Sequence, residues 1–287
     1  MKVFFYLISI IPKPFIVFTV DLFIYTKLYK FIKYYKITKV NLGIAYKDLS
    51  SENLENLSKL SIRESLIGIY ETFYTWGRGH VYSNSKIFKI KNNFLLKNKL
   101  NEGRGLIAVS IHNRSVDMLL KWVNSQITTV SLYKRVKNKR LDKFVKRNRE
   151  HDGALCYETT MLGVRNLLKA LKKNGAVCFA ADQVPKRGMG EYINFFGRDA
   201  YSTTLVQSLA VKTKATVLYL YINSSPKNFL SISIERCNED IYNDSKHKLL
   251  LNKDIERIIK NRPIDYSWEY KRFKRSKHPN KDPYKTI

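Results

Sequence analysis

Two residues of the stretch "IAVSIHNRSVDMLLKWV", His112 and Asp117, have the types and the spacing for acid–base chemistry. A neutral imidazole accepts a proton near neutral pH, and a nearby carboxylate fixes its tautomer and stabilises the imidazolium that forms. On a regular helix, a separation of five residues places two side chains roughly 140° apart. The pair can therefore meet only if His112 lies in a loop and Asp117 in the first turn of a helix, with Ser115 as its N-cap.

Metal and thiol chemistry are less well supported by the residue pattern. One His and one Asp are too few ligands for zinc. The other histidines show no metal-ligand spacing: His80, His151, His247 and His278. The cysteines form no CxxC pair: Cys156, Cys178 and Cys237. We expect free, mostly buried thiols in a reducing compartment, and neither a metal ion nor another cofactor.

The elements that would position His112 follow from the apolar pattern. Short apolar runs predict strands near residues 105, 127, 153 and 176. Amphipathic runs between them predict helices over 116–125, 137–150 and 161–174. This alternation is typical of an α/β fold with a mixed, mostly parallel sheet flanked by helices. Sites in such sheets form where strands end and helices begin, which is where His112 lies.

Other segments complete the expected domain. Residues 50–76 predict one or two helices that cover the core, and 215–222 with 229–235 predict an antiparallel hairpin. The polar, basic tail from Ser276 onward is expected to be loosely ordered.

The N-terminal segment differs in character from the rest of the chain. Residues 3–25 are mostly apolar, with interruptions at 12–14 and at Asp21, and lysines follow. A spanning helix needs about 20 mostly apolar residues. We expect residues 1–40 to be an uncleaved membrane anchor helix with a basic flank, either spanning or lying in the interface, rather than a buried soluble helix. The lysines would keep residues 41–287, the catalytic domain, on the cytoplasmic face.

The net charge is unusual for a globular chain. The sequence holds 52 Lys and Arg residues against 24 Asp and Glu residues, which gives a net charge of +28. Such a field attracts nucleic acid, anionic lipid, phosphorylated substrates or an acidic protein. No nucleic-acid-binding motif accompanies the charge, so we expect no nucleic acid partner.

Four blocks, in order over roughly residues 40–275, resemble one protein family. The block "HNRSVD" resembles the His-x4-Asp/Glu motif of glycerolipid and lipid A acyltransferases. The segments "LYKRVKNKRLDKFVKRNREHDG", "ADQVPKRGMGEYINFFG" and "YSWEYKRFK" are similar to later blocks of the bacterial lipid A biosynthesis lauroyl/myristoyl acyltransferases. The resemblance implies a glycerolipid acyltransferase-like fold with an N-terminal membrane anchor at the bacterial inner membrane, its catalytic domain facing the cytoplasm.

The resemblance also implies a reaction and residue roles. A fatty acyl chain would pass from the thioester of acyl carrier protein to a hydroxyl of a phosphorylated glycolipid, a lipid A precursor. His112 would be the general base and Asp117 would orient it. Arg149 would bind a substrate phosphate or stabilise the oxyanion, and Asp182 matches the first acidic position of the Asp-Gln block.

Two positions depart from the family pattern. Val184 stands where relatives usually carry a second acid, and Tyr270 where many carry His. Because the His/Asp pair is intact, these departures bear on what the resemblance implies for acceptor recognition more than on what it implies for the chemistry. Two alternatives stay open: an acyltransferase for another lipid, such as a glycerophospholipid, glycolipid or aminolipid, and a non-enzymatic basic protein that binds membranes or nucleic acid. The sequence leaves open the length of the acyl chain, the position acylated on the acceptor and the oligomeric state. It also leaves open whether the acyl donor is a thioester of acyl carrier protein or of coenzyme A.

Overall fold

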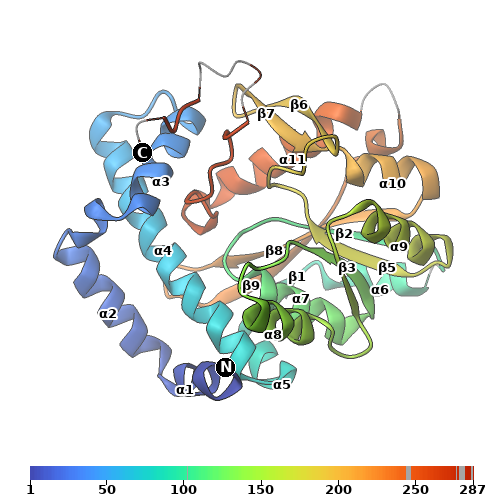
Figure 1. Ribbon diagram of the computed structural model, residues 1–287, viewed down its shortest axis with the longest axis horizontal. Helices are drawn as coiled ribbons and strands as arrows, with labels where there is room; N and C mark the ends of the chain where they lie inside the picture. The colour runs from blue at the N-terminus through green and yellow to red at the C-terminus, as the bar shows by residue number, and fades with distance from the viewer. Residues whose placement is uncertain (102, 244–246, 276, 278–281, 286) are drawn as a thin grey trace.

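A seven-stranded sheet forms the centre of the computed structural model, which describes residues 1–287 except 102, 244–246, 276, 278–281 and 286 (Figure 1). Its strand order is β1-β9-β8-β2-β5-β3-β4, and all neighbours are parallel except β8 and β9. The strands are β1 (Ile87–Lys91), β2 (Leu106–Ser110), β3 (Thr129–Tyr133), β4 (Leu155–Glu158), β5 (Ala176–Ala180), β8 (Thr216–Ser224) and β9 (Leu230–Arg236). A separate antiparallel pair joins β6 (Gly190–Phe195) and β7 (Arg198–Thr203).

Helices cover both faces of the sheet. They are α3 (Lys33–Ala45), α4 (Ser51–Gly77), α5 (His80–Asn84), α6 (Asn93–Asn101), α7 (Val116–Gln126), α8 (Lys139–Arg149), α9 (Met161–Lys172), α10 (Leu205–Thr213) and α11 (His247–Asn261). Alternate side chains of a strand point to opposite faces. Ile107 and Val109 pack with residues of α3, α9, α10 and α11, whereas Leu106 and Ala108 pack with residues of α4, α6 and α7. A strand buried on both faces explains the unbroken apolar run of β2.

Most of the predicted elements are confirmed. The expected α/β class, the strands near 105, 127, 153 and 176 and the three helices between them are all present. The hairpin is β8 and β9, and residues 50–76 form a single helix. Ser50 caps this helix, since its side chain accepts a hydrogen bond from the backbone N–H of Asn53. Half of the C-terminal tail lies outside the described residues. Within the described part, Tyr284 is buried and donates a hydrogen bond to Asn41, so the tail is not loosely ordered at this residue.

The N-terminal arm consists of α1 (Lys2–Ile10), α2 (Lys13–Tyr25) and the short helix η1 (Leu28–Phe31), which lie along the outer side of α4 (Figure 1). A Cβ on Gly77 would lie 2.3 Å from the carbonyl oxygen of Phe5, so glycine allows α1 to approach α4 closely. No single helix of the described chain is long and apolar enough to cross a membrane. The α1 and α2 helices reach that threshold only together, with a bend of 87° between them.

The predicted domain boundary at residue 40 stays a prediction. It falls inside α3, whose Ile37 and Leu42 both pack in the main core.

The sheet register determines where the site lies. The β2 and β5 strands are parallel neighbours, with Ser110 opposite Ala180 at their carboxyl ends. The backbone N–H of Ala181 still bonds to Ser110, at 3.1 Å. Residues two positions beyond each end, His112 and Asp182, therefore emerge side by side at the same edge of the sheet.

Candidate functional site

The side chain of His112 is held by a carboxylate from the neighbouring strand. Nδ1 of His112 lies 2.8 Å from Oδ1 of Asp182, and the backbone N–H of His112 donates to Oδ2 at 3.2 Å. Asp182 is 1% exposed, whereas the His112 side chain is 29% exposed. One buried carboxylate thus binds both the backbone and the ring of His112. This fixes the orientation of the imidazole.

The contact also sets the charge preference of both groups. Burial disfavours the imidazolium, but the charge of the Asp182 carboxylate and its hydrogen bond to the ring together outweigh burial, so the pKa of His112 lies above its ordinary value. Burial likewise opposes the charged form of Asp182, yet His112 lowers the pKa of this carboxyl. In the neutral ring, Nδ1–H donates a hydrogen bond to the carboxylate, which leaves Nε2 as the basic nitrogen.

Asp117 pairs with Arg149 instead of His112. Nε of Arg149 lies 2.7 Å from Oδ1 of Asp117, and Nη2 lies 3.0 Å from Oδ2. The pair joins the first turn of α7 to the last turn of α8. Burial opposes ionisation of Asp117, but Arg149 outweighs it and lowers the pKa of the carboxyl. A bidentate guanidinium–carboxylate contact is among the strongest of the charged hydrogen bonds.

This arrangement differs from the expected His112–Asp117 contact. The predicted backbone is present, because His112 lies in the loop after β2 and Ser115 caps α7 by accepting from the N–H of Met118 at 3.1 Å. Asp117 lies in the first turn of α7, and the guanidinium of Arg149 in the last turn of α8 binds both of its carboxylate oxygens. The carboxylate at Nδ1 of His112 comes instead from the residue after β5.

The loop between His112 and α7 is fixed through its backbone. The N–H of Arg114 bonds to the carbonyl of Asp265 at 2.9 Å, and the N–H of Ser267 bonds to the carbonyl of His112 at 2.9 Å. Arg114 has a φ of 54°, a left-handed conformation that is rare for a residue with a side chain. Such a conformation persists only where surrounding contacts enforce it.

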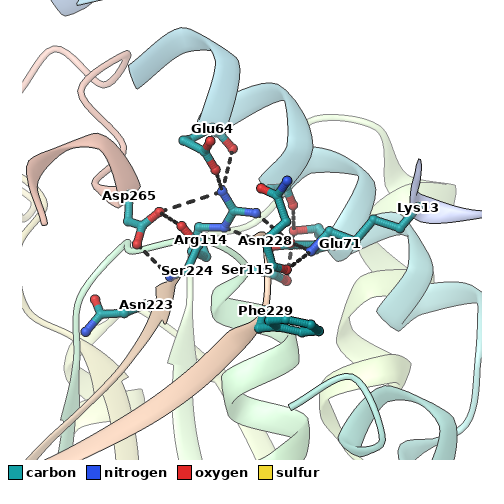
Figure 2. Close-up of polar contacts among 12 residues, drawn as sticks. Lys13, Glu64, Glu71, Arg114, Ser115, Asn223, Ser224, Asn228, Phe229 and Asp265 are labelled. Atoms are coloured by element: carbon teal, nitrogen blue, oxygen red, sulfur yellow. Dashed lines mark hydrogen bonds and ion pairs between the residues drawn. The ribbon is translucent and has the colours of Figure 1, made fainter. Parts of the chain in front are cut away.

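The Arg114 side chain supplies those contacts, as Figure 2 shows. Its guanidinium, fully buried, binds Glu64 and Glu71 of α4 and lies 3.7 Å from a carboxylate oxygen of Asp265. The second Glu71 oxygen accepts from Nε of Arg114 at 3.1 Å. Asp265 in turn accepts from the backbone N–H and the hydroxyl of Ser224, both at 2.7 Å.

The same cluster reaches the N-terminal arm. From α2, Lys13 binds Glu71 at 2.9 Å, and Asp21 binds Arg63, which in turn contacts Glu64. Four cations are thereby matched with four carboxylates: Lys13, Arg63, Arg114 and Arg262 with Asp21, Glu64, Glu71 and Asp265. The matching matters because an uncompensated buried charge is costly.

A cavity of about 480 Å³ opens beside these residues. His112, Asp117 and Arg149 line it, and Asp182 supports His112 from behind. Part of the wall is apolar: Val116, Leu119, Leu120, Leu132, Phe179 and Leu205. Another part is basic: Lys134, Lys186, Lys274 and Arg275. All four predicted site residues therefore converge, and the cavity offers room for both an apolar and an anionic ligand group.

Two features of the site were missed by sequence reasoning. Arg114 lies inside the "HNRSVD" block, where the His-x4-Asp spacing assigns no role to it. Glu64 and Glu71 interrupt the buried face of α4 seven residues apart, which is two helical turns and places both on one side. Buried carboxylates on an otherwise core-facing helix signal an internal cation.

The two residues that depart from the family pattern contact each other, since the backbone N–H of Val184 donates to the hydroxyl of Tyr270 at 3.2 Å.

Replacement of Arg114 by methionine is expected to lower the free energy of unfolding by about 3–5 kcal/mol, because Glu64 and Glu71 lose their buried counter-charge. Urea denaturation followed by circular dichroism measures the change. The matched control is Arg135→Met, whose exposed side chain pairs with Asp142 and Glu158 and whose loss should cost less than about 1 kcal/mol. Equal effects of the two substitutions would show that the buried cluster does not stabilise the fold.

Replacement of Asp182 by asparagine is expected to lower the pKa of His112. The carboxylate that favours the imidazolium is lost, whereas burial and the positive charge of Arg149 remain. NMR titration of labelled histidine side chains measures the shift, with the exposed Asp48→Asn as the control. An unchanged or raised pKa would contradict the contact between Asp182 and His112.

Comparison with known proteins identifies the family of the chain. Residues 2–275 match the family model for bacterial lipid A biosynthesis acyltransferases. The chain is 24% identical over 250 residues to the lipid A biosynthesis palmitoleoyltransferase of Escherichia coli K12 and to the lipid A biosynthesis acyltransferase of Shigella flexneri, covering 83% of this chain and 78% of each relative. The match spans the arm, the loop of His112 and Asp117, and the segments of Arg149 and Asp182. The chain belongs to the bacterial lipid A biosynthesis acyltransferase family.

Proposed function

We propose that the protein transfers a fatty acyl chain from the thioester of acyl carrier protein to a hydroxyl of a lipid A precursor, at the cytoplasmic face of the bacterial inner membrane. The family membership supports acyl transfer in lipid A biosynthesis. The observation that carries the mechanism is the contact of His112 with the buried Asp182 at the wall of the cavity.

His112 is the general base in this proposal. Nε2 takes the proton of the acceptor hydroxyl, and the oxygen attacks the carbonyl carbon of the thioester. Asp182 holds the ring and stabilises the imidazolium. When the tetrahedral intermediate collapses, the carbon–sulfur bond breaks, and the thiolate takes the proton back from Nε2. The products are an ester and a thiol, and His112 returns to its neutral form.

Arg149 and Asp117 form the second functional pair. The ion pair uses Nε and Nη2 of Arg149, which leaves Nη1 for a ligand oxygen in the cavity. We assign Arg149 to the developing oxyanion or to a substrate phosphate, because a guanidinium serves both. Asp117 keeps its proposed importance to the reaction, but it acts by orienting Arg149.

The charge of the cavity fits anionic ligands. Lys134, Lys186, Lys274 and Arg275 bring four cations to its wall. The acceptor in this proposal carries phosphates and the carrier protein is acidic, so the basic wall and the net charge of +28 favour both. The apolar wall beside His112 provides surface for the first part of an acyl chain.

The N-terminal arm would attach the protein to the bilayer by lying in its interface. Large apolar side chains are exposed along the arm: Val3, Phe4, Tyr6, Leu7, Ile10, Phe15, Phe18, Leu22, Tyr25, Leu28 and Phe31. Such a surface is typical of helices that bury one face among lipid headgroups. The 87° bend and the ion pairs of Lys13 and Asp21 with α4 favour this arrangement over a single spanning helix.

Transfer is expected to depend on His112. With purified protein, an acyl carrier thioester and a lipid A precursor, His112→Ala should reduce the rate by about 10²- to 10⁴-fold, the usual contribution of a general base. The wild-type rate should rise with pH through the pKa of His112, because only the neutral ring accepts a proton and that pKa is raised. His247→Ala, at the first residue of α11, is the control.

Mass spectrometry of membrane lipids from cells with and without the protein identifies the acceptor. The expected result is a lipid A species lighter by one acyl chain in the deletion strain and in the His112→Ala strain. Loss of an acyl group from another lipid would keep the mechanism and change the substrate. Unchanged lipids, together with tight, salt-dependent nucleic acid binding, would contradict the proposal.

A further inference from the structure

Two histidines that are 71 residues apart in the sequence meet on the surface beside α5 and α8. Nδ1 of His80 lies 2.7 Å from Nε2 of His151. The neighbouring Asp152 places Oδ2 at 3.0 Å from the same His151 nitrogen and at 3.8 Å from the His80 nitrogen. Three atoms that can each donate a lone pair therefore converge on one point.

The spacing of these three atoms suits a tetrahedral metal ion. Zinc binds imidazole nitrogen at about 2.0–2.1 Å and carboxylate oxygen at about 2.0–2.2 Å, so the edges of a zinc tetrahedron measure roughly 3.3–3.4 Å. The three observed separations lie on both sides of this value, within about 0.7 Å of it. Small rotations of the side chains would equalise them.

The chemistry of the ligands is also suitable. Imidazole nitrogen and carboxylate oxygen are both common ligands of Zn²⁺ and of the neighbouring divalent transition metals. A neutral imidazole is the form that binds metal. The nearby ammonium of Lys121 is bound by the carbonyl oxygens of Thr75, at 2.5 Å, and Arg78, at 2.9 Å.

We propose that His80, His151 and Asp152 bind a divalent transition metal ion, with Zn²⁺ as the best match to two imidazoles and one carboxylate. The three side chains are partly exposed, which leaves a fourth position for water. The metal would tie the start of α5 to the segment that follows α8, two residues beyond Arg149. It does not enter the acyl transfer chemistry, where Asp117 and Asp182 each already have a cationic or imidazole partner.

Metal titration of the full-length, tag-free protein tests this site. Protein freed of metal with a chelator is titrated with Co²⁺, whose visible spectrum reports a tetrahedral nitrogen and oxygen environment, and then with Zn²⁺ in competition. We expect one equivalent of metal, also detected by elemental analysis after dialysis. His80→Gln and His151→Gln should each weaken binding at least tenfold, whereas His247→Gln should not.

Asp152→Asn provides a second variant that keeps both histidines, and circular dichroism confirms that each variant is folded. The absence of a stoichiometric metal ion in the wild type, or binding that His80→Gln and His151→Gln leave unchanged, would overturn the proposal. The readout is metal binding alone, so this result is independent of whether the protein transfers acyl chains to lipid A.

Discussion

The fully buried guanidinium of Arg114 is the interaction on which the geometry of the site depends. Arg114 lies in the loop between His112 and α7, and its backbone has a left-handed conformation. Glu64, Glu71 and Asp265 compensate the charge of its guanidinium. Glu64 and Glu71 belong to α4, and Asp265 belongs to a C-terminal segment whose backbone also bonds to the loop. Parts of the chain that are about 200 residues apart thus converge on one side chain. Because α2 contacts the same cluster through Lys13 and Asp21, ion pairs connect the N-terminal arm to the residues that hold the loop of His112.

Two polar contacts lie at this edge of the sheet, one between His112 and Asp182 and one between Asp117 and Arg149. The β2 and β5 strands place His112 and Asp182 at equivalent positions, so the register of two parallel strands aligns the imidazole with the carboxylate. The helices α7 and α8 deliver Asp117 and Arg149, so their packing aligns the cation. The sequence predicted one contact, between His112 and Asp117. The structure has two contacts instead, His112 with Asp182 and Arg149 with Asp117, and both border the same cavity.

The order of strands and helices around His112 could be predicted from the sequence, because apolar alternation is a local signal. The position of Asp117 in a first helical turn also follows locally, from the Ser115 cap. The partners of Asp117 and His112 cannot be predicted from such local signals. Whether Asp117 faces His112 or Arg149 depends on how α8 packs, and the meeting of His112 with Asp182 depends on β2 and β5 being neighbours, which no local pattern reveals. The contact of His80 with His151 could not be predicted for the same reason. Sequence spacing identifies metal ligands only when they lie close together in the sequence.

A double-mutant cycle on the rate of acyl transfer tests the central claim that Asp182, rather than Asp117, acts through His112. The rates of His112→Gln, Asp182→Asn and the double variant would be compared, alongside the cycle for His112→Gln with Asp117→Asn. If Asp182 acts through the imidazole, its substitution should cost almost nothing once His112 is absent, whereas Asp117→Asn should still reduce the residual rate, because it acts through Arg149. Independent effects of His112 and Asp182, with coupling between His112 and Asp117 instead, would contradict this arrangement.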